Sequence, residues 1–91
     1  MANHKSALKR AKQDELKRIR NKSYKTKVKK AIKEVRTAVA SNSAEQSRQN
    51  LVKAVSIIQK TGSKRIIHKK QASRKISRLT HLVNKLETQS P

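Results

Sequence analysis

Six lysine and arginine residues between positions 18 and 36 recur at intervals of three or four. They are Arg18, Lys22, Lys25, Lys29, Lys33 and Arg36. Residues at this spacing share one face of an α-helix, so a helix here carries a continuous row of positive charge. Ammonium and guanidinium groups bind phosphate oxygens through charge-assisted hydrogen bonds. The row is therefore suited to binding a polyanion.

A second group of cations lies between positions 64 and 78 and holds seven of the 25 lysine and arginine residues. Lys70, Arg74 and Arg78 lie on the side of a helix opposite an apolar stripe, so that helix buries one side and offers the other to phosphate. The start of this helix, near His68, is a candidate phosphate pocket because the first turn of a helix attracts anions. Packing or capping by His68 is an equal alternative.

The charge balance favours binding over a merely solvated face. The chain has 91 residues, with five acids against 25 Lys and Arg, and a formal net charge of +20; twelve cations lie in residues 1–30. Exposed helices usually mix signs, but no acid lies between Glu15 and Glu34 or between Glu45 and Glu87. We therefore expect a polyanionic partner, and we expect residues 1–25 to become ordered when it binds.

Residues suited to catalysis or metal binding are sparse. The chain has no cysteine, its acids are scattered, and His4, His68 and His81 are far apart in sequence. It also lacks a glycine-rich phosphate loop and a nucleophile motif. We expect no enzymatic activity, no cofactor and no metal site.

We expect helices to position the cations, because glycine and proline are the residues that most disfavour a helix. Each occurs only once in the chain, as Gly62 and Pro91. Apolar stripes predict three helices, at 6–40, 44–60 and 66–87. The stripes are Val28, Ile32, Val35 and Val39; Leu51, Val55 and Ile58; and Ala72, Ile76, Leu79, Val83 and Leu86. The first extends more thinly toward the amino terminus through Leu8, Ala11, Leu16 and Ile19.

Two helix boundaries carry local signals. Ser43 with Gln46 three residues later fits a capping box at the start of the second helix, with Ser41 as an alternative cap. Gly62 suits the left-handed residue that ends many helices.

The unequal helix lengths predict the shape. At 1.5 Å per residue the first helix spans about 50 Å and the second about 25 Å, so the second cannot cover the first. We expect an all-α fold, a three-helix antiparallel bundle with a long, basic, protruding first helix. Residues 1–91 form a single domain with a basic arm at 1–25, the bundle at 26–87 and a tail at 88–91. No homo-oligomer is expected.

The scarcity of aromatic residues narrows the class of partner. Single-strand binders stack bases on several aromatic rings, whereas this chain has only Tyr24, which is more often a core-edge residue than a stacking platform. Without base stacking, the remaining mode of nucleic-acid recognition is contact with the phosphates and 2′-hydroxyls of folded, largely double-helical RNA. The alternative is an architectural protein that binds duplex DNA, which usually adds an apolar wedge.

Membrane association is less favoured. No apolar run approaches the roughly 20 residues needed to cross a bilayer, and the Trp or Phe expected on a membrane-surface helix is missing. The charged amino terminus also lacks the apolar core of a secretory signal, so we expect an intracellular protein.

Several segments of the chain form distinctive motifs: residues 2–10 (ANHKSALKR), 21–23 (NKS) and 67–75 (IHKKQASRK), followed by 77–80 and 84–86. In these segments the chain resembles one family, the bacterial small-subunit ribosomal proteins numbered twenty, whereas residues 41–60 match only in pattern. The resemblance implies a structural constituent of the small ribosomal subunit in the cytoplasm. Such a protein would bind 16S ribosomal RNA directly through phosphate contacts and bridge RNA helices during assembly.

Candidate RNA contacts follow from the resemblance and from the charge pattern. The resemblance implies arm contacts by Asn3, Lys5, Ser6, Lys9 and Arg10, and third-helix contacts by His68, Lys69, Arg74, Lys75 and Arg78. The charge pattern adds Lys12, Lys17, Arg18, Lys22, Lys25, Lys29, Lys64, Arg65 and Lys70. If about ten phosphates are neutralised, log affinity should fall with log salt at a slope of roughly −7 to −9.

Overall fold

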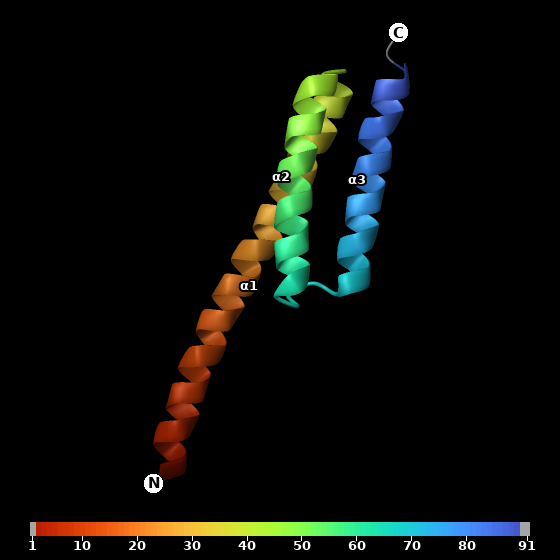
Figure 1. Cartoon of the computed structure of the whole chain (residues 1–91). Helices are drawn as coiled ribbons and strands as arrows, with labels where there is room; N and C mark the ends of the chain where they lie inside the picture. Colours follow the sequence, from red (N-terminus) through yellow and green to blue (C-terminus); the bar gives the residue numbers. More distant parts are fainter. Residues whose placement is uncertain (1, 90–91) are drawn as a thin grey trace.

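Three α-helices make up the computed structural model, which describes residues 2–89 and the side chains of residues 6–87. α1 spans Ala2–Ala40, α2 spans Ala44–Ser63 and α3 spans Lys69–Gln89. The chain reverses direction after α1 and again after α2, so that neighbouring helices are antiparallel (Figure 1). The expected all-α, three-helix fold is confirmed, although the observed helix ends differ from the predicted ones by up to four residues.

α1 continues far beyond the bundle. The molecule measures 72 × 21 × 13 Å, and the amino-terminal half of α1 has no helix beside it (Figure 1). Every described side chain of the arm before Tyr24 is exposed. The long, protruding, basic first helix is therefore present as predicted.

The apolar stripe of α1 does not extend into the arm, and that expectation was wrong. Leu8, Leu16 and Ile19 are 60%, 57% and 53% exposed. Ile19 precedes Val28 by nine residues, which at about 100° per residue places it half a turn away from the buried side of the helix.

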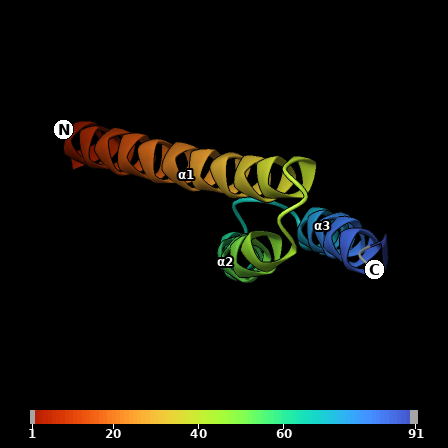
Figure 2. The ribbon, with the colours of Figure 1, turned by 90° about the horizontal axis from the view of Figure 1, so that it is seen from above.

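The core lies where the three helices run side by side. Its buried apolar residues are Val28, Val35 and Ala38 of α1, Ala54 and Ile58 of α2, and Ala72, Leu79 and Val83 of α3. Most belong to the predicted stripes, and Ile32, Val39, Leu51 and Ile76 pack against them while half-buried. α2 packs extensively on both neighbours, whereas α1 and α3 touch each other much less (Figure 2).

Two buried hydroxyl groups in α2 were not predicted as core residues. Ser47 and Thr61 are fully buried, and each donates a hydrogen bond to a carbonyl oxygen one turn earlier: Ser47 Oγ to Ser43 at 2.6 Å and Thr61 Oγ1 to Ile57 at 2.7 Å. Because the helix itself satisfies these hydroxyls, small polar residues can face the core without an unpaired donor.

α2 ends in a turn where Arg65 takes the left-handed conformation, with φ of 61°. Its N–H donates to the carbonyl oxygen of Gly62 at 3.0 Å, and the N–H of Ile66 donates to that of Thr61 at 3.2 Å, which is the Schellman pattern. The expectation that Gly62 supplies the left-handed residue was wrong, because Gly62 lies inside α2 without a positive φ. Its missing side chain serves helix packing instead, since a Cβ there would lie 3.0 Å from the Cβ of Ala72.

The turn between α1 and α2 uses the same pattern, with Asn42 at φ 57°. The N–H of Asn42 donates to Val39 at 3.0 Å and that of Ser43 to Ala38 at 3.1 Å. Ser43 is the N-cap of α2, but it makes no side-chain cap hydrogen bond, so the expected capping box is not formed. The N–H that Gln46 would need as a partner is already bonded to Ala38.

Replacing Gly62 with Val should destabilise the protein by about 1–3 kcal/mol, because the new methyl groups would meet Ala72 in a packed contact. Thermal unfolding followed by circular dichroism would measure this as a fall in Tm of about 4–8 °C per kcal/mol. The matched control, Ser63→Val, changes the next and exposed residue and should leave Tm nearly unchanged. Equal melting of G62V and the parent would refute the close approach of α2 and α3.

Replacing Arg65 with Gly should stabilise the free protein by about 1 kcal/mol, since glycine adopts a positive φ without the steric cost of a Cβ. Lys64→Gly is the control: Lys64 is the adjacent residue, has a right-handed φ of −79°, and carries the same charge. It should lower Tm. The idea fails if R65G and K64G change Tm in the same direction.

Candidate nucleic-acid interface

The cationic row of α1 forms a continuous basic ridge along this helix, which we call the α1 ridge. It consists of Arg18, Lys22, Lys25, Lys29, Lys33 and Arg36, all of which are exposed. Two shallow grooves of about 390 and 410 Å³ lie along it and share Lys29. The regular spacing leaves space between neighbouring cations for anionic groups.

α3 brings further cations next to the carboxyl end of the α1 ridge. A groove of about 410 Å³ between α1 and α3 is lined by the apolar residues Ile32, Leu79 and Leu82 and by the cations Arg36, Lys75 and Arg78. Arg36 belongs to the row seen in the sequence but was not among the predicted contacts. Only the packing of α1 near α3 shows that it shares a groove with Lys75 and Arg78.

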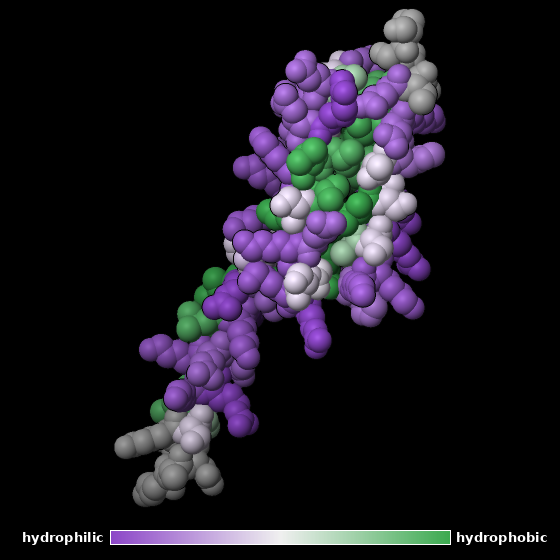
Figure 3. Space-filling view, viewed as in Figure 1, coloured by the Kyte–Doolittle hydropathy of each residue, from purple (hydrophilic) through white to green (hydrophobic). Residues whose placement is uncertain are grey.

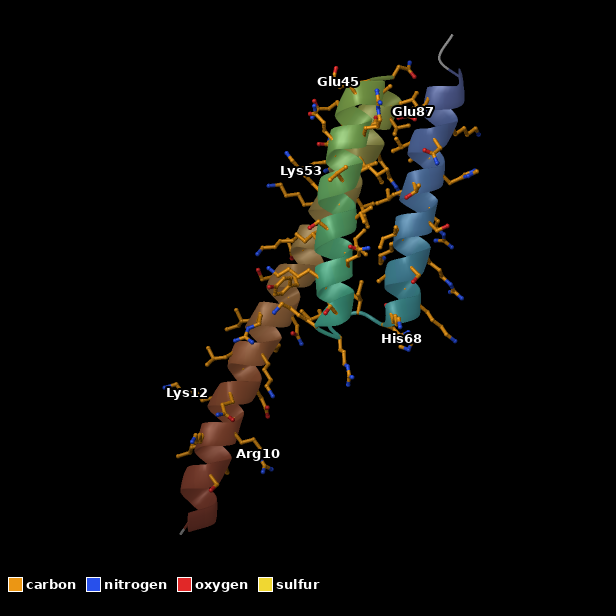
Figure 4. All side chains as sticks on the ribbon, viewed as in Figure 1. Arg10, Lys12, Glu45, Lys53, His68 and Glu87 are labelled. Atoms are coloured by element: carbon orange, nitrogen blue, oxygen red, sulfur yellow. The ribbon has the colours of Figure 1, made fainter. Side chains whose placement is uncertain are left out.

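His68 caps α3. Its Nδ1 accepts a hydrogen bond from the N–H of Lys70 at 3.1 Å, and its carbonyl oxygen accepts one from the N–H of Ala72 at 3.0 Å. The capping alternative is therefore confirmed. Because Nδ1 is an acceptor, the ring hydrogen of the neutral imidazole lies on Nε2, which can donate to an external oxygen. His68 is exposed at the start of α3 (Figure 4), beside a groove of about 830 Å³ that Arg65 and Lys69 also line.

Tyr24 is half-buried and interacts with cations of two helices. Lys27 Nζ lies 5.1 Å and Lys64 Nζ 5.6 Å from the centre of its ring, within the range of cation–π interactions. Lys64 comes from the end of α2, so the ring ties that end to α1. These contacts favour the core-edge interpretation of Tyr24 over a base-stacking platform.

Arg18, at the amino end of the α1 ridge, is paired with an acid. Its Nη2 lies 2.7 Å from Glu15 Oε1, and its Nε donates to Oε2 at 3.1 Å. The hydrogen bond, and then the charge attraction, lower the pKa of Glu15 and raise that of Arg18. The pair is exposed and so adds little stability, but it offsets one ridge charge.

A second ion pair joins α2 to α3 near the open end of the bundle. Arg48 Nε lies 2.9 Å from Glu87 Oε1, although that oxygen accepts no aligned hydrogen bond. Glu45 and Glu87 both lie at this end of the molecule (Figure 4), far along the bundle from His68. These two acids, of α2 and α3, therefore lie away from the start of α3.

The remaining predicted contacts are spread over two helices. Ser6, Lys9, Arg10, Lys12 and Lys17 are exposed on the arm, and Lys69, Lys70 and Arg74 are exposed on α3, where Lys75 is half-buried. The side chains of Asn3 and Lys5 lie outside the described residues. The site is therefore an extended surface rather than a pocket, and Figure 3 shows a largely hydrophilic arm with apolar residues gathered over the bundle.

The described part of the chain offers neither a metal site nor a membrane span. Among its side chains, no group of three His, Cys, Asp or Glu residues could hold a metal ion. None of its helices combines the length and apolar character that crossing a membrane requires.

Comparison with known proteins identifies the family. The family model described as ribosomal protein S20 matches residues 2–84. The small ribosomal subunit protein bS20 of Syntrophobacter fumaroxidans is 54% identical over 86 residues, which cover 94% of this chain and 100% of the relative. That of Geobacter sulfurreducens is 51% identical over 86 residues, covering 94% and 99%. The chain therefore belongs to the ribosomal protein S20 family, a family of structural ribosomal proteins and not of enzymes, as residues 2–10 and 67–75 had predicted.

Proposed function

We propose that this protein is a structural constituent of the small ribosomal subunit in the bacterial cytoplasm, where it binds 16S ribosomal RNA directly through phosphate contacts. In this role it bridges RNA helices during assembly of the subunit. Family membership supports the ribosomal role. The observation that carries the RNA contact is the groove between α1 and α3, where cations of two helices meet.

The groove has the composition of a phosphate-binding surface. Arg36 and Arg78 can each donate two parallel hydrogen bonds to a phosphate, and Lys75 adds a third positive charge. The apolar residues that line the groove offer a surface on which the aliphatic parts of long cations can pack. No acid lines the groove, so no carboxylate competes with phosphate there.

The lack of free aromatic surface points to folded RNA rather than single strands. Tyr24 is the only aromatic residue, and Lys27 and Lys64 already lie over its ring. Recognition must therefore use the phosphates and 2′-hydroxyls that a double-helical RNA presents on its surface.

Replacing Arg78 with Gln should weaken binding to a 5′-domain fragment of 16S RNA about tenfold, because hydrogen bonds to charged groups are strong. It should also reduce the magnitude of the salt slope by about 1, which titrations at several salt concentrations would measure. The control is Lys53→Gln, which removes an exposed cation of α2 beside the groove between α1 and α2. Competition with random duplex DNA in the same assay distinguishes ribosomal RNA binding from the alternative of duplex-DNA binding. If the protein is retained equally well on DNA, the ribosomal proposal is overturned.

Replacing Glu15 with Gln should strengthen binding to the same RNA, because it releases Arg18 from its ion pair. One additional phosphate contact should make the salt slope more negative by about 0.7–0.9. Glu45→Gln adds the same unit of charge at the exposed start of α2 and serves as the control. An identical gain in both variants would mean that only net charge matters and that the α1 ridge is not a specific contact.

A further inference from the structure

A groove between α2 and α3 lies at the end of the bundle where a turn joins these two helices (Figure 1). We call it the turn groove. Its volume is about 830 Å³, against about 410 Å³ for the groove between α1 and α3, and it falls within the range of small-ligand sites. The half-buried residues Ile67 and Ile76 and the buried Ala72 give it an apolar lining. The turn groove can therefore accept an apolar group of a ligand.

Three groups that can bind phosphate also line the turn groove. The side chains of Arg65 and Lys69 are exposed, and neither forms an ion pair with another described residue. His68 uses Nδ1 to cap α3, so its ring is held in place and Nε2 is the nitrogen left to donate. No acid lines the groove. An apolar recess bordered by cations is complementary to a ligand that joins an apolar group to an anion.

Arg65 occupies a backbone position that does not favour arginine. The turns after α1 and after α2 follow the same hydrogen-bond pattern, and their left-handed residues are Asn42 and Arg65. Asparagine adopts this conformation much more readily than residues with longer side chains. Strained residues of this kind cluster at binding sites. The geometry of the turn does not account for an arginine here, whereas a ligand in the turn groove does.

Polar side chains in the turn groove distinguish between two classes of ligand. Gln59, Ser63 and Ser73 line the groove and are exposed, and their side chains form no hydrogen bond with another described residue. Amide and hydroxyl groups are those with which proteins bind the edges of nucleobases. The acyl chain of a lipid would use none of them. The groove is therefore better suited to a nucleotide than to a lipid.

We propose that the turn groove binds a single unpaired nucleotide of the RNA, such as one bulged from a double helix. The base lies against the apolar lining with the guanidinium of Arg65 stacked on it, and its phosphate binds Lys69 and His68 Nε2. Guanidinium planes stack on unpaired bases as aromatic rings do, so this contact requires no free aromatic residue. The inference rests on the proposed RNA binding and deepens it, because it adds one base to an interface of phosphate contacts.

The test compares two RNA hairpins that differ only in a single unpaired adenosine, present in the stem of one and absent from the other. The readout is the ratio of their dissociation constants, so that a general loss of affinity for phosphate cancels. Ser73→Glu places a carboxylate in the turn groove. The matched control, Gln71→Glu, makes the same charge change on another side of α3, outside the groove. Both positions are exposed, and circular dichroism verifies that the two variants are equally helical.

The wild-type protein should bind the hairpin with the unpaired adenosine at least about fivefold more tightly, as expected for one stacked base. Ser73→Glu should reduce this preference to less than about twofold, because the carboxylate repels the phosphate, and Gln71→Glu should retain it. Arg65→Lys keeps the charge but lacks the planar group, so it should lose most of the preference without changing the salt slope. Arg65→Gly should lose the preference while raising Tm, a combination that a purely structural role of Arg65 would not produce.

Equal binding of the two hairpins by the wild-type protein would overturn the nucleotide site and leave RNA binding intact. A preference that survives both Ser73→Glu and Arg65→Lys would also overturn it, because the bulge would then act through the flexibility of the RNA. Vesicles containing phosphatidylserine test the other class of ligand: binding that Ser73→Glu abolishes and Gln71→Glu does not, with an unchanged RNA ratio, would assign the groove to a lipid. Failure of the wild-type protein to bind either hairpin would instead refute the proposed function.

Discussion

Close packing of small side chains is the constraint on which the rest of the structure depends. Ala54 and the hydroxyl residues Ser47 and Thr61 are fully buried in α2, and Gly62 faces Ala72 where a Cβ would lie only 3.0 Å away. A chain without aromatic core residues must bring its helices near one another to exclude water. This proximity places the cations of α3 beside those of α1, so that the core determines the geometry of the phosphate-binding groove.

Positive charge could be accommodated because it was kept out of that core. Each helix buries one stripe and leaves its described cations exposed, apart from the half-buried Lys75 of α3. Along α1 the pairing of Arg18 with Glu15 offsets one positive charge. The exposed positive charge therefore favours association with an anionic partner.

Much of this arrangement could be predicted from local patterns. The stripes from Val28 to Val39 and from Ala72 to Leu86 located the buried sides of α1 and α3, because helix periodicity is a local property. Predictions about helix ends were poorer. Arg65 rather than Gly62 takes the left-handed conformation, and Gln46 finds no capping partner, because both outcomes depend on which backbone groups the neighbouring turn has already used.

The sequence by itself determined the helices, their buried stripes, the basic character of the exposed faces and, through its terminal motifs, the ribosomal family. These properties depend on residue types and on spacing within one helix. Only the tertiary structure decided that Arg36 shares a groove with Lys75 and Arg78, and that α2 ends beside Tyr24. Both depend on how far one helix extends along another, and this distance is set by packing between helices rather than by the periodicity of one helix.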